Sequence, residues 1–296
     1  MQEVFCMKSA YLRYFAALLL FGSNGIVAGR LHMNSCEIVF WRTLIGSLLL
    51  AALFFLSHGK IRFWRYKKQS LFLCLSGMAM GASWMFLYEA YAQVGVSVAS
   101  LCYYCGPVIV MALSPALFRE RLTAANAVGF AAVLCGVFLV NGGTPGGGGV
   151  RGSFCGFMSA VMYAAMVICN KKAAPIGGLE NATLQLCVSF LTVAAFVLFR
   201  QGFALSVPRG DVIPLLALGL INTGAGCYLY FSSIGRLPVQ TVSLCGYLEP
   251  LSAVVFSMLF LHETMSPVQI AGAVLIIAGA VAGEAVRFKK KIPSGT

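Results

Sequence analysis

Charge is scarce in this sequence, and acidic charge is scarcest. Of its 296 residues only 10% are Asp, Glu, Lys or Arg, and just 9 are acidic. A soluble globular domain carries about 25% charged residues, because its surface must face water. The composition is instead 59% hydrophobic, with a mean hydropathy of +0.87. These values exclude a water-soluble domain over most of the chain and predict a protein whose outer surface faces lipid.

Residue sets that perform catalysis or hold metals are also missing. The three histidines, His32, His58 and His262, fall at the edges of apolar stretches, and no nucleophile–base set accompanies them. Cys102 and Cys105 have the spacing of half a zinc site, but no second pair or His cluster completes it. The eleven cysteines fit better as small apolar side chains inside the membrane. We therefore predict no enzyme, no metal site and no cofactor.

The net charge of +12 does not indicate nucleic-acid binding. The basic residues form short clusters between apolar stretches, which is the pattern of side chains that anchor helices at a membrane surface. The expected partners are the lipid bilayer and a small-molecule substrate, with no nucleic acid. No feature of the sequence indicates an oligomeric state.

Apolar stretches of about 18 to 23 residues recur from end to end, which is the length that spans a bilayer core as a helix. They predict ten transmembrane helices, over residues 11–29, 37–56, 71–94, 97–118, 124–141, 153–171, 182–200, 212–234, 239–261 and 267–286. The expected fold class is an all-α polytopic membrane protein.

A glycine-rich stretch at 142–149 divides the chain almost in half. A nucleotide-binding glycine loop would need a strand before it and Lys-Ser or Lys-Thr after it, and neither is present. We interpret the stretch as a flexible linker. The predicted organisation is a five-helix repeat over 1–141, an external glycine-rich linker over 142–152, and a second five-helix repeat with a basic cytoplasmic tail over 153–296.

The two halves are related in sequence at a constant offset of 143 residues. The matches are Ser100-Leu101-Cys102 with Ser243-Leu244-Cys245, Tyr104 with Tyr247, Pro107 with Pro250, Ser114 with Ser257, Glu120 with Glu263, Gly129 with Gly272, and Gly136 with Gly279. Five helices per half is an odd number, so the second copy is expected to cross the membrane upside down. Such inverted repeats are the basis of alternating access in secondary transporters.

The basic residues also predict the orientation. With the amino terminus in the cytoplasm, 16 of the 21 Lys and Arg residues lie inside and Arg42 lies within a span. The four outside are Arg30, Arg151, Arg200 and Arg209. This bias follows the positive-inside rule, so both termini are expected in the cytoplasm.

Glu249 is the ionisable residue expected nearest the middle of the membrane. It lies ten residues into the helix predicted over 239–261, about 15 Å from its inner end at 1.5 Å per residue. Pro250 lacks a backbone N–H and clashes with the preceding turn, so a kink is expected there, and Pro107 is its repeat partner. A carboxylate at a kinked helix suits a cation, an ammonium group or a coupling proton. The alternative is a protonated Glu that serves packing only.

Arg42 and Glu89 are expected at similar depth, each five residues inside the outer end of its helix. An ion pair between them is the ordinary way in which two such charges are tolerated in a membrane. We predict this pair as a structural contact or a gate, and direct substrate contact is an equal alternative.

Aromatic and amide side chains complete the predicted site. Trp84 and Tyr88 share one face of the third helix. Together with Glu249, such rings form a cation–π cage for an ammonium group or a stacking surface for an aromatic solute. The full predicted substrate-binding set is Glu249, Asn24, Trp84, Tyr88, Tyr103, Tyr228 and Tyr247. For any single aromatic residue, packing is the competing interpretation.

Short motifs recur in the same order through both halves. They are Phe21-Gly22-Ser23-Asn24, Arg42, Ser97-Val98-Ala99-Ser100-Leu101, Gly106-Pro107, Glu120-Arg121-Leu122, Gly129 and Gly136, followed by Leu248-Glu249-Pro250, Leu261-His262-Glu263, Gly272 and Gly279. In this order and spacing the chain resembles the EamA-type, ten-helix branch of the drug/metabolite transporter superfamily, over essentially its whole length.

The resemblance implies transport of metabolites, often export of amino acids or related compounds, through a central cavity between the halves. We expect a secondary transporter of the bacterial plasma membrane for an amino acid, amine or related aromatic or cationic compound, with export favoured over import. The coupling ion is open, and a proton is one candidate. The alternatives are a lipid-linked substrate flippase of the same superfamily and a membrane enzyme or receptor that transports nothing.

Overall fold

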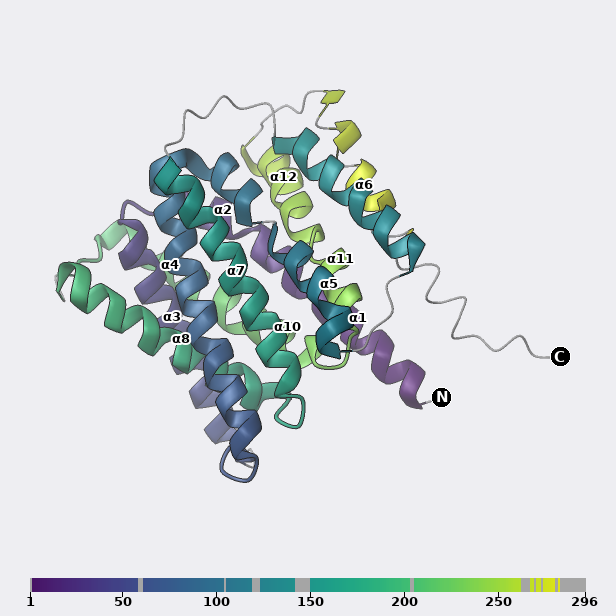
Figure 1. The fold of residues 1–296 in the computed structure, drawn as a ribbon. Helices are drawn as coiled ribbons and strands as arrows, with labels where there is room; N and C mark the ends of the chain where they lie inside the picture. Colours follow the sequence, from purple (N-terminus) through teal and green to yellow (C-terminus); the bar gives the residue numbers. More distant parts are fainter. Residues whose placement is uncertain are drawn as a thin grey trace.

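The computed structural model is entirely helical in its regular elements, which pack side by side in one bundle (Figure 1). The residues it describes are 2–57, 61–103, 105–118, 123–141, 150–202, 205–261, 267–268, 270–272, 274–279 and 282. The glycine-rich stretch 142–149 lies outside the described residues, as do the connections 119–122 and 262–266.

The helices follow one another along the chain with short connections. In the first half they are α1 (Gln2–Gly22), α2 (Asn24–Ala28), α3 (Ser35–Leu56), α4 (Lys67–Tyr103), α5 (Cys105–Phe118) and α6 (Ala124–Asn141). In the second half they are α7 (Val150–Lys172), α8 (Gly178–Gln201), the 3-10 turn η1 (Arg209–Asp211), α9 (Val212–Ala217), the π-helix η2 (Leu218–Ala225), α10 (Gly226–Ile234), α11 (Val239–Cys245) and α12 (Leu248–Leu261). The described residues between 267 and 282 are helical as well.

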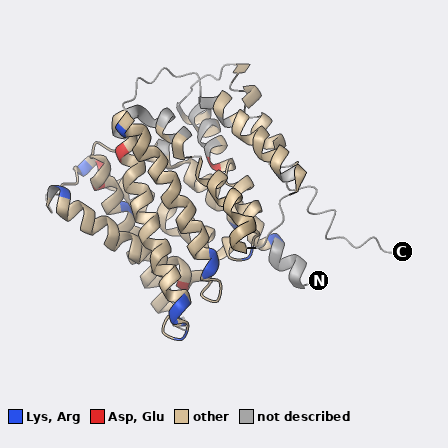
Figure 2. Cartoon of the chain, viewed as in Figure 1, with Lys and Arg blue, Asp and Glu red and all other residues tan. Residues whose placement is uncertain are grey.

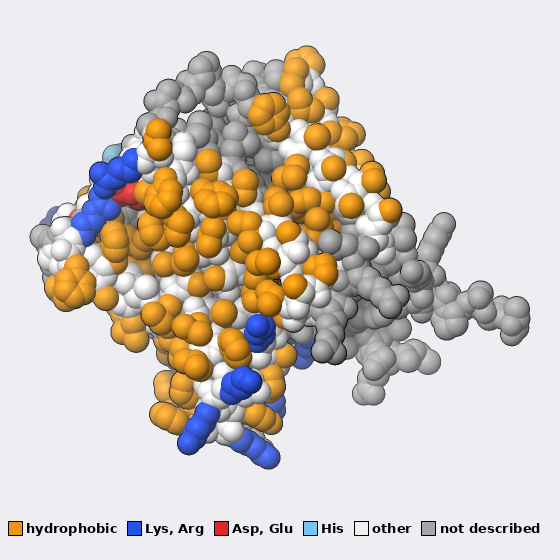
Figure 3. Space-filling view, viewed as in Figure 1, with side chains coloured by type: hydrophobic (Ala, Val, Ile, Leu, Met, Phe, Trp, Pro, Cys, Tyr) orange, Lys and Arg blue, Asp and Glu red, His pale blue; other side chains and the backbone are white. Residues whose placement is uncertain are grey.

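These elements account for the ten predicted spans. Within the described residues, six helical stretches are long and apolar enough to cross a membrane: Lys8–Ala28, Ser35–Leu56, Lys67–Ala90, Val150–Lys172, Gly178–Arg200 and Arg209–Ile234. The shorter apolar helices α5, α6 and 270–279, with the interrupted pair α11 and α12, supply the rest. Hydrophobic side chains cover most of the described face seen in Figure 3. The predicted fold class, an all-α polytopic membrane protein, is confirmed.

Several helix ends differ from the prediction by a few residues, and two of the differences bear on the repeat. The break expected between 94 and 97 is wrong, because α4 continues without interruption to Tyr103. The second half does break at the equivalent place, where Pro238 precedes α11, whereas the first half has Gly95 there. Proline has no backbone N–H to donate to the preceding turn, so the helix is interrupted in the second half and continues in the first. The other difference is at Val150, where α7 already begins, inside the stretch predicted as linker.

The second half interrupts a helix near the middle of the membrane, where the turn Gly246-Tyr247 separates α11 from α12. Pro250 lies in the first turn of α12, just after this break. A proline there lacks only an N–H that the first turn leaves unpaired in any case. The structure therefore has a break just before Pro250, where a kink was predicted. The equivalent residue of the first half, Tyr104, lies outside the described residues, and Pro107 lies in α5.

Packing between the halves repeats itself with the halves exchanged. The pair α4 and α7 is mirrored by α10 and α1, and the pair α4 and α8 by η2 and α3. Gly136 of α6 lies against the last helix so closely that a Cβ would be 2.6 Å from the Gly272 oxygen. Its repeat partner Gly279 would place a Cβ 2.5 Å from the Gly129 oxygen. Small residues that let two backbones approach in this way are typical of membrane helix contacts.

The bundle has two chemically different ends. We call the end formed by residues 61–67, 171–178 and 235–238 the basic end, because Arg62, Lys67, Lys171 and Arg236 lie there. The opposite end is formed by residues 29–34, 200–202 and 205–211. Figure 2 shows most of the charged positions near the helix ends and few along their middles.

Candidate functional site

Arg42 is buried inside the bundle although it carries a full charge. It lies on α3 with only 3% of its surface exposed. Its Nε donates a hydrogen bond to Thr223 Oγ1 at 3.0 Å, and its Nη1 donates one to Tyr88 Oη at 3.1 Å. The guanidinium also lies over the ring of Trp84, 4.7 Å from the ring centroid, in a cation–π contact. Two aromatic residues of the predicted site therefore meet at Arg42.

Thr223 reaches the guanidinium through a local change in its helix. Residues Leu218–Ala225 form the π-helix η2, in which Thr223 Oγ1 donates to the Leu218 carbonyl at 2.8 Å. π-helical turns are rare and frequently mark functional sites. A close approach to α3 holds η2 in place, since a Cβ at Gly219 would lie 2.7 Å from Ile45. The π-helical turn in the span predicted over 212–234 therefore contains the residue that contacts the buried guanidinium.

The predicted ion pair between Arg42 and Glu89 is wrong. Glu89 instead forms a short ion pair with Arg200 of α8, and it accepts a hydrogen bond from Gln93 Nε2 at 2.6 Å. Successive residues of a helix point about 100° apart. Because Tyr88 faces Arg42, its neighbour Glu89 is turned towards α8. The charges of α3 and α4 therefore belong to two separate clusters.

Glu249 lies in the first turn of α12, just after the helix break. Its side chain is half-buried. Its backbone N–H donates to the Gly246 carbonyl at 3.1 Å, which occupies the acceptor that Pro250 cannot reach. Negative charge is stabilised at a helix N-terminus by the helix dipole. Transporters bind substrates and coupling ions at interrupted helices of this kind near the middle of the membrane.

Arg42 and Glu249 bring opposite charges from opposite halves of the chain. Counting about 1.5 Å per residue, Arg42 lies about 10 Å into α3 from one end, and Glu249 about 15 Å from the start of α11 at the other. In a bilayer core of about 30 Å these depths differ by only about 5 Å. The two charges form no direct ion pair within the described part of the chain. Their repeat partners, Gln185 and Gly106, are both uncharged.

A row of tyrosines reaches the turn that precedes Glu249. The rings of Tyr103 and Tyr163 are 5.4 Å apart, and the hydroxyls of Tyr163 and Tyr230 are 3.3 Å apart. The ring of Tyr230 lies 5.6 Å from that of Tyr14, whose hydroxyl donates to a carbonyl of α11 at 2.7 Å. A Cβ at Gly246, three residues before Glu249, would be 3.4 Å from that hydroxyl. The row thus joins α4, α7, α10 and α1 and ends at the turn before α12.

Asn24 has a buried oxygen without a partner. Its Oδ1 accepts no hydrogen bond within the described residues. Asn222 lies in the adjoining η2 and donates to the Leu20 carbonyl at 2.7 Å and to Ser23 Oγ at 2.8 Å, which stabilises the break between α1 and α2. Since buried polar atoms are nearly always paired, the unpaired oxygen of Asn24 indicates room for a water or a substrate group.

Two predicted site residues lie in the apolar core. Tyr247 is fully buried, and its ring is 5.9 Å from that of Phe130, in a cluster with apolar residues of α5, α6 and the last helix. Tyr228 is half-buried on α10 and packs against the main hydrophobic cluster. The packing interpretation fits these two better than substrate binding.

The repeat also sets one carboxylate at each end of the bundle. Glu180, near the start of α8, accepts from the Arg62 and Phe63 N–H groups at 2.6 and 2.9 Å. Its partner Glu37, near the start of α3, accepts from Asn34 N–H at 3.1 Å and from Ser206 N–H at 3.5 Å. Phe63 and Ser206 are themselves repeat partners. In each half, therefore, the equivalent glutamate accepts hydrogen bonds from the backbone of a loop in the other half.

Sequence analysis missed Tyr14, Glu180 and the pairing of Arg200. The offset of 143 would have singled out Glu37 and Glu180, because both members of that pair are acidic. Nothing comparable identifies Tyr14, whose partner in the structure is a backbone carbonyl more than 200 residues away.

Comparison with known proteins agrees with this architecture. The model of the EamA-like transporter family matches the chain twice, over residues 8–142 and 150–282. Transporter YxxF of Bacillus subtilis is 25% identical over 92% of this chain and 88% of its own length. The threonine/homoserine exporter RhtA of Escherichia coli is 27% identical over 85% of this chain and 82% of its own.

A solved crystal structure has the same fold. It superposes with a TM-score of 0.81 at 18% identity, over 94% of this chain and 99% of its own. The two family matches together cover nearly the whole chain, one in each half. The chain is therefore a multi-pass membrane transporter that belongs to the EamA-like transporter family.

Proposed function

We propose that this transporter exports a small zwitterion, of the amino-acid class, by alternating access. The observation that carries the proposal is the separated pair of charges. Arg42 and Glu249 come from opposite halves of the chain, lie at similar depth and form no direct ion pair within the described residues. A solute with one carboxylate and one ammonium group would neutralise both.

The carboxylate end of the substrate is assigned to Arg42. A buried guanidinium without a counter-ion is costly in a membrane, and the hydroxyls of Tyr88 and Thr223 offset only part of that cost. Arginine presents five N–H donors in a planar fork that matches a carboxylate. Tyr88, Thr223 and Trp84 hold this fork in one orientation.

The ammonium end is assigned to Glu249. Glu249 begins α12 directly after the turn that the row of tyrosines from Tyr103 to Tyr14 reaches. Aromatic faces bind ammonium groups, so the rings add to the attraction of the carboxylate. The unpaired Oδ1 of Asn24 is one further acceptor, on an element that packs against α12.

The direction of transport follows from orientation and from the relatives. We place the basic end in the cytoplasm of a bacterial plasma membrane, with both termini inside, because Lys and Arg are enriched at that end. The name of RhtA supports export of an amino acid. The inverted halves supply two equivalent conformations, one open to each side. Protonation of Glu249 would provide coupling to a proton gradient.

The test is transport by purified protein in liposomes. A thermal-shift screen of amino acids, polyamines and quaternary amines would select the probe, starting with L-threonine. We expect Glu249→Gln and Arg42→Gln each to abolish concentrative transport while folded protein is retained. Arg65→Gln, which removes an exposed charge at the basic end, should transport normally. Wild-type transport by both site variants would refute the proposal.

A coupling role and a binding role of Glu249 can be separated. If the carboxylate only couples a proton, Glu249→Gln should retain substrate exchange and lose the dependence of exchange on pH, since an amide does not titrate. If it binds the ammonium group, exchange and affinity should both be lost.

A further inference from the structure

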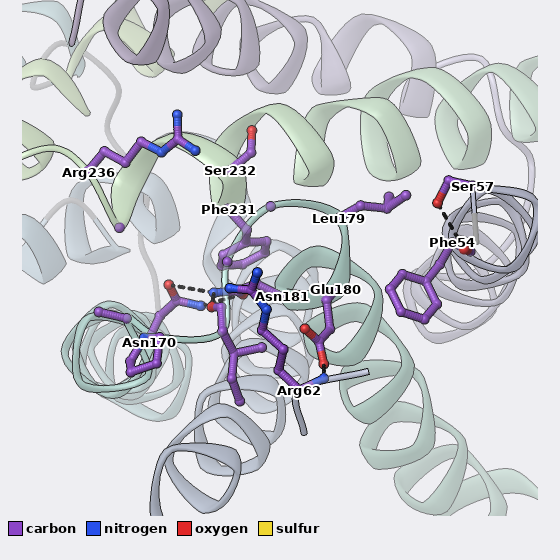
Figure 4. Close-up of a pocket in the computed structure, with 16 residues that line it drawn as sticks. Phe54, Ser57, Arg62, Asn170, Leu179, Glu180, Asn181, Phe231, Ser232 and Arg236 are labelled. Atoms are coloured by element: carbon purple, nitrogen blue, oxygen red, sulfur yellow. Dashed lines mark hydrogen bonds between the residues drawn. The ribbon is translucent and has the colours of Figure 1, made fainter. Parts of the chain in front are cut away.

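A cavity of about 550 Å³ opens at the basic end of the bundle, well away from Arg42. Its walls come from the ends of α3, α7 and α10 and from the start of α8 (Figure 4). Phe54 lines the cavity and lies twelve residues after Arg42 on α3. At 1.5 Å per residue, the cavity is about 18 Å along the helix from Arg42. The cavity is therefore separate from the site proposed for the substrate.

The charges around this cavity are mainly positive. Arg62 and Arg236 line it together with a single carboxylate, that of Glu180. That carboxylate is 7% exposed and accepts from two backbone N–H groups of the 61–66 segment. The Arg62 guanidinium forms no hydrogen bond or ion pair with a side chain in the described part of the chain. Both arginine side chains are exposed, and the one carboxylate beside them already accepts two hydrogen bonds.

The start of α8 adds backbone donors to the same cavity. Its N-cap is Gly177, which has no side chain to accept from the first N–H groups. The repeat partner of Gly177 is Asn34, whose side chain caps α3 at 2.9 Å. Added side-chain atoms at Gly177 or Gly178 would meet nothing within 4 Å, so this end of the helix faces open space. Uncapped N–H groups and the helix dipole together favour an anion.

The inverted repeat shows how the lining of this cavity differs from the equivalent place at the opposite end. Glu89 and Arg200 bridge α4 and α8 at the opposite end. Their repeat partners are Ser232 and Ser57, which both line the cavity. Two short hydroxyl side chains thus replace a bridging ion pair.

We propose that this cavity is a binding site for a phosphate group, held by Arg62, Arg236 and the N-terminal amides of α8. Guanidinium groups and helix N-termini are the two elements that proteins use most readily to bind phosphate. The phosphate comes from a phospholipid headgroup or from a soluble phosphate ester, and the two sources share the same chemistry at the site.

The test uses the full chain in an uncharged detergent, with inorganic phosphate as the probe. Phosphate replaces chloride at constant ionic strength while the melting temperature is measured. We expect a saturable rise in the wild type and in Arg65→Gln, a neighbouring charge that does not line the cavity. Arg62→Gln should weaken the affinity for phosphate at least tenfold, and Arg62→Lys should weaken that affinity less. Ser232→Glu should abolish binding, because it supplies the carboxylate that Glu89 provides at the opposite end.

Two outcomes would overturn the proposal. One is the absence of a saturable effect in the wild type. The other is an equal effect in the wild type, Arg62→Gln and Ser232→Glu, which would indicate a general salt effect. Melting without phosphate shows whether each variant is folded.

Competition identifies the source of the phosphate. Tighter binding of a short-chain phosphatidic acid than of glycerol phosphate assigns the site to a lipid headgroup, and equal binding assigns it to a soluble ester.

Discussion

The two halves of this protein agree in their scaffold and differ in their charges. Gly136 and Gly279 make the same close contact with the halves exchanged. The positions of Arg42 and Glu249, in contrast, carry Gln185 and Gly106 in the other half. Features that the repeat duplicates hold the bundle together, whereas the charges that it does not duplicate are those that we propose to bind a solute.

The uncharged partners have packing roles of their own. Gln185 is fully buried and donates to Ser76 Oγ at 2.6 Å. Gly106 lies against Tyr163 so closely that a Cβ would be 2.7 Å from the ring. The chain therefore uses one copy of each position for structure and the other for charge.

The largest effect is expected for the inversion itself. In a variant without reactive native cysteines, a cysteine at position 294 should be labelled only from the cytoplasm, and one at position 147 only from outside. This all-or-none result follows from an odd number of spans per half and from the positive-inside rule. Labelling of both positions from the same face would contradict the inverted arrangement.

Substitution of the two duplicated carboxylates, Glu180 and Glu37, should lower the stability of the protein by different amounts. Glu180→Ala should lower the free energy of unfolding by about 3 kcal/mol, because two backbone N–H groups lose a charged acceptor. Glu37→Ala should cost about half as much, since its bond to the other half is longer, at 3.5 Å. Denaturant titration in one detergent would measure both. A larger loss for Glu37→Ala would show that the two connections are not held in the same way.

The duplicated glycines should behave alike. Gly136→Ala and Gly279→Ala should each cost about 2 kcal/mol, because the new Cβ would press on a backbone oxygen of the facing helix. Gly210→Ala is the matched control, since a Cβ there would meet nothing within 4 Å. Clearly unequal costs at the two glycines would mean that the halves do not pack equivalently.

The smallest effect is expected for the ion pair that the repeat does not duplicate. Glu89 and Arg200 are partly exposed, so a double-mutant cycle should give a coupling of about 0.2 to 1 kcal/mol. The same cycle between Glu89 and Arg42 should be additive within about 0.5 kcal/mol, because the side chains do not meet. A stronger coupling to Arg42 than to Arg200 would restore the pairing that the sequence suggested.

Sequence patterns predicted the spans and the repeat because both depend on residue type alone. Apolar length predicts a span, and a proline at 107 or 250 predicts an interruption nearby. Side-chain partners depend instead on helix rotation, which the sequence does not specify. That is why Glu89 was assigned to Arg42, although a turn of about 100° from Tyr88 directs it to Arg200. The π-helix at Thr223 had no signal in composition or spacing.

The most direct test of the two-charge site is to measure which end of the substrate each residue binds. The best amino acid from the screen, its decarboxylated amine and its deaminated acid would be titrated against the wild type, Arg42→Gln and Glu249→Gln. The wild type should prefer the zwitterion at least tenfold over either analogue. Arg42→Gln should lose the preference over the amine, and Glu249→Gln the preference over the acid. Unchanged preferences in both variants would contradict the assignment of Arg42 and Glu249 to the substrate.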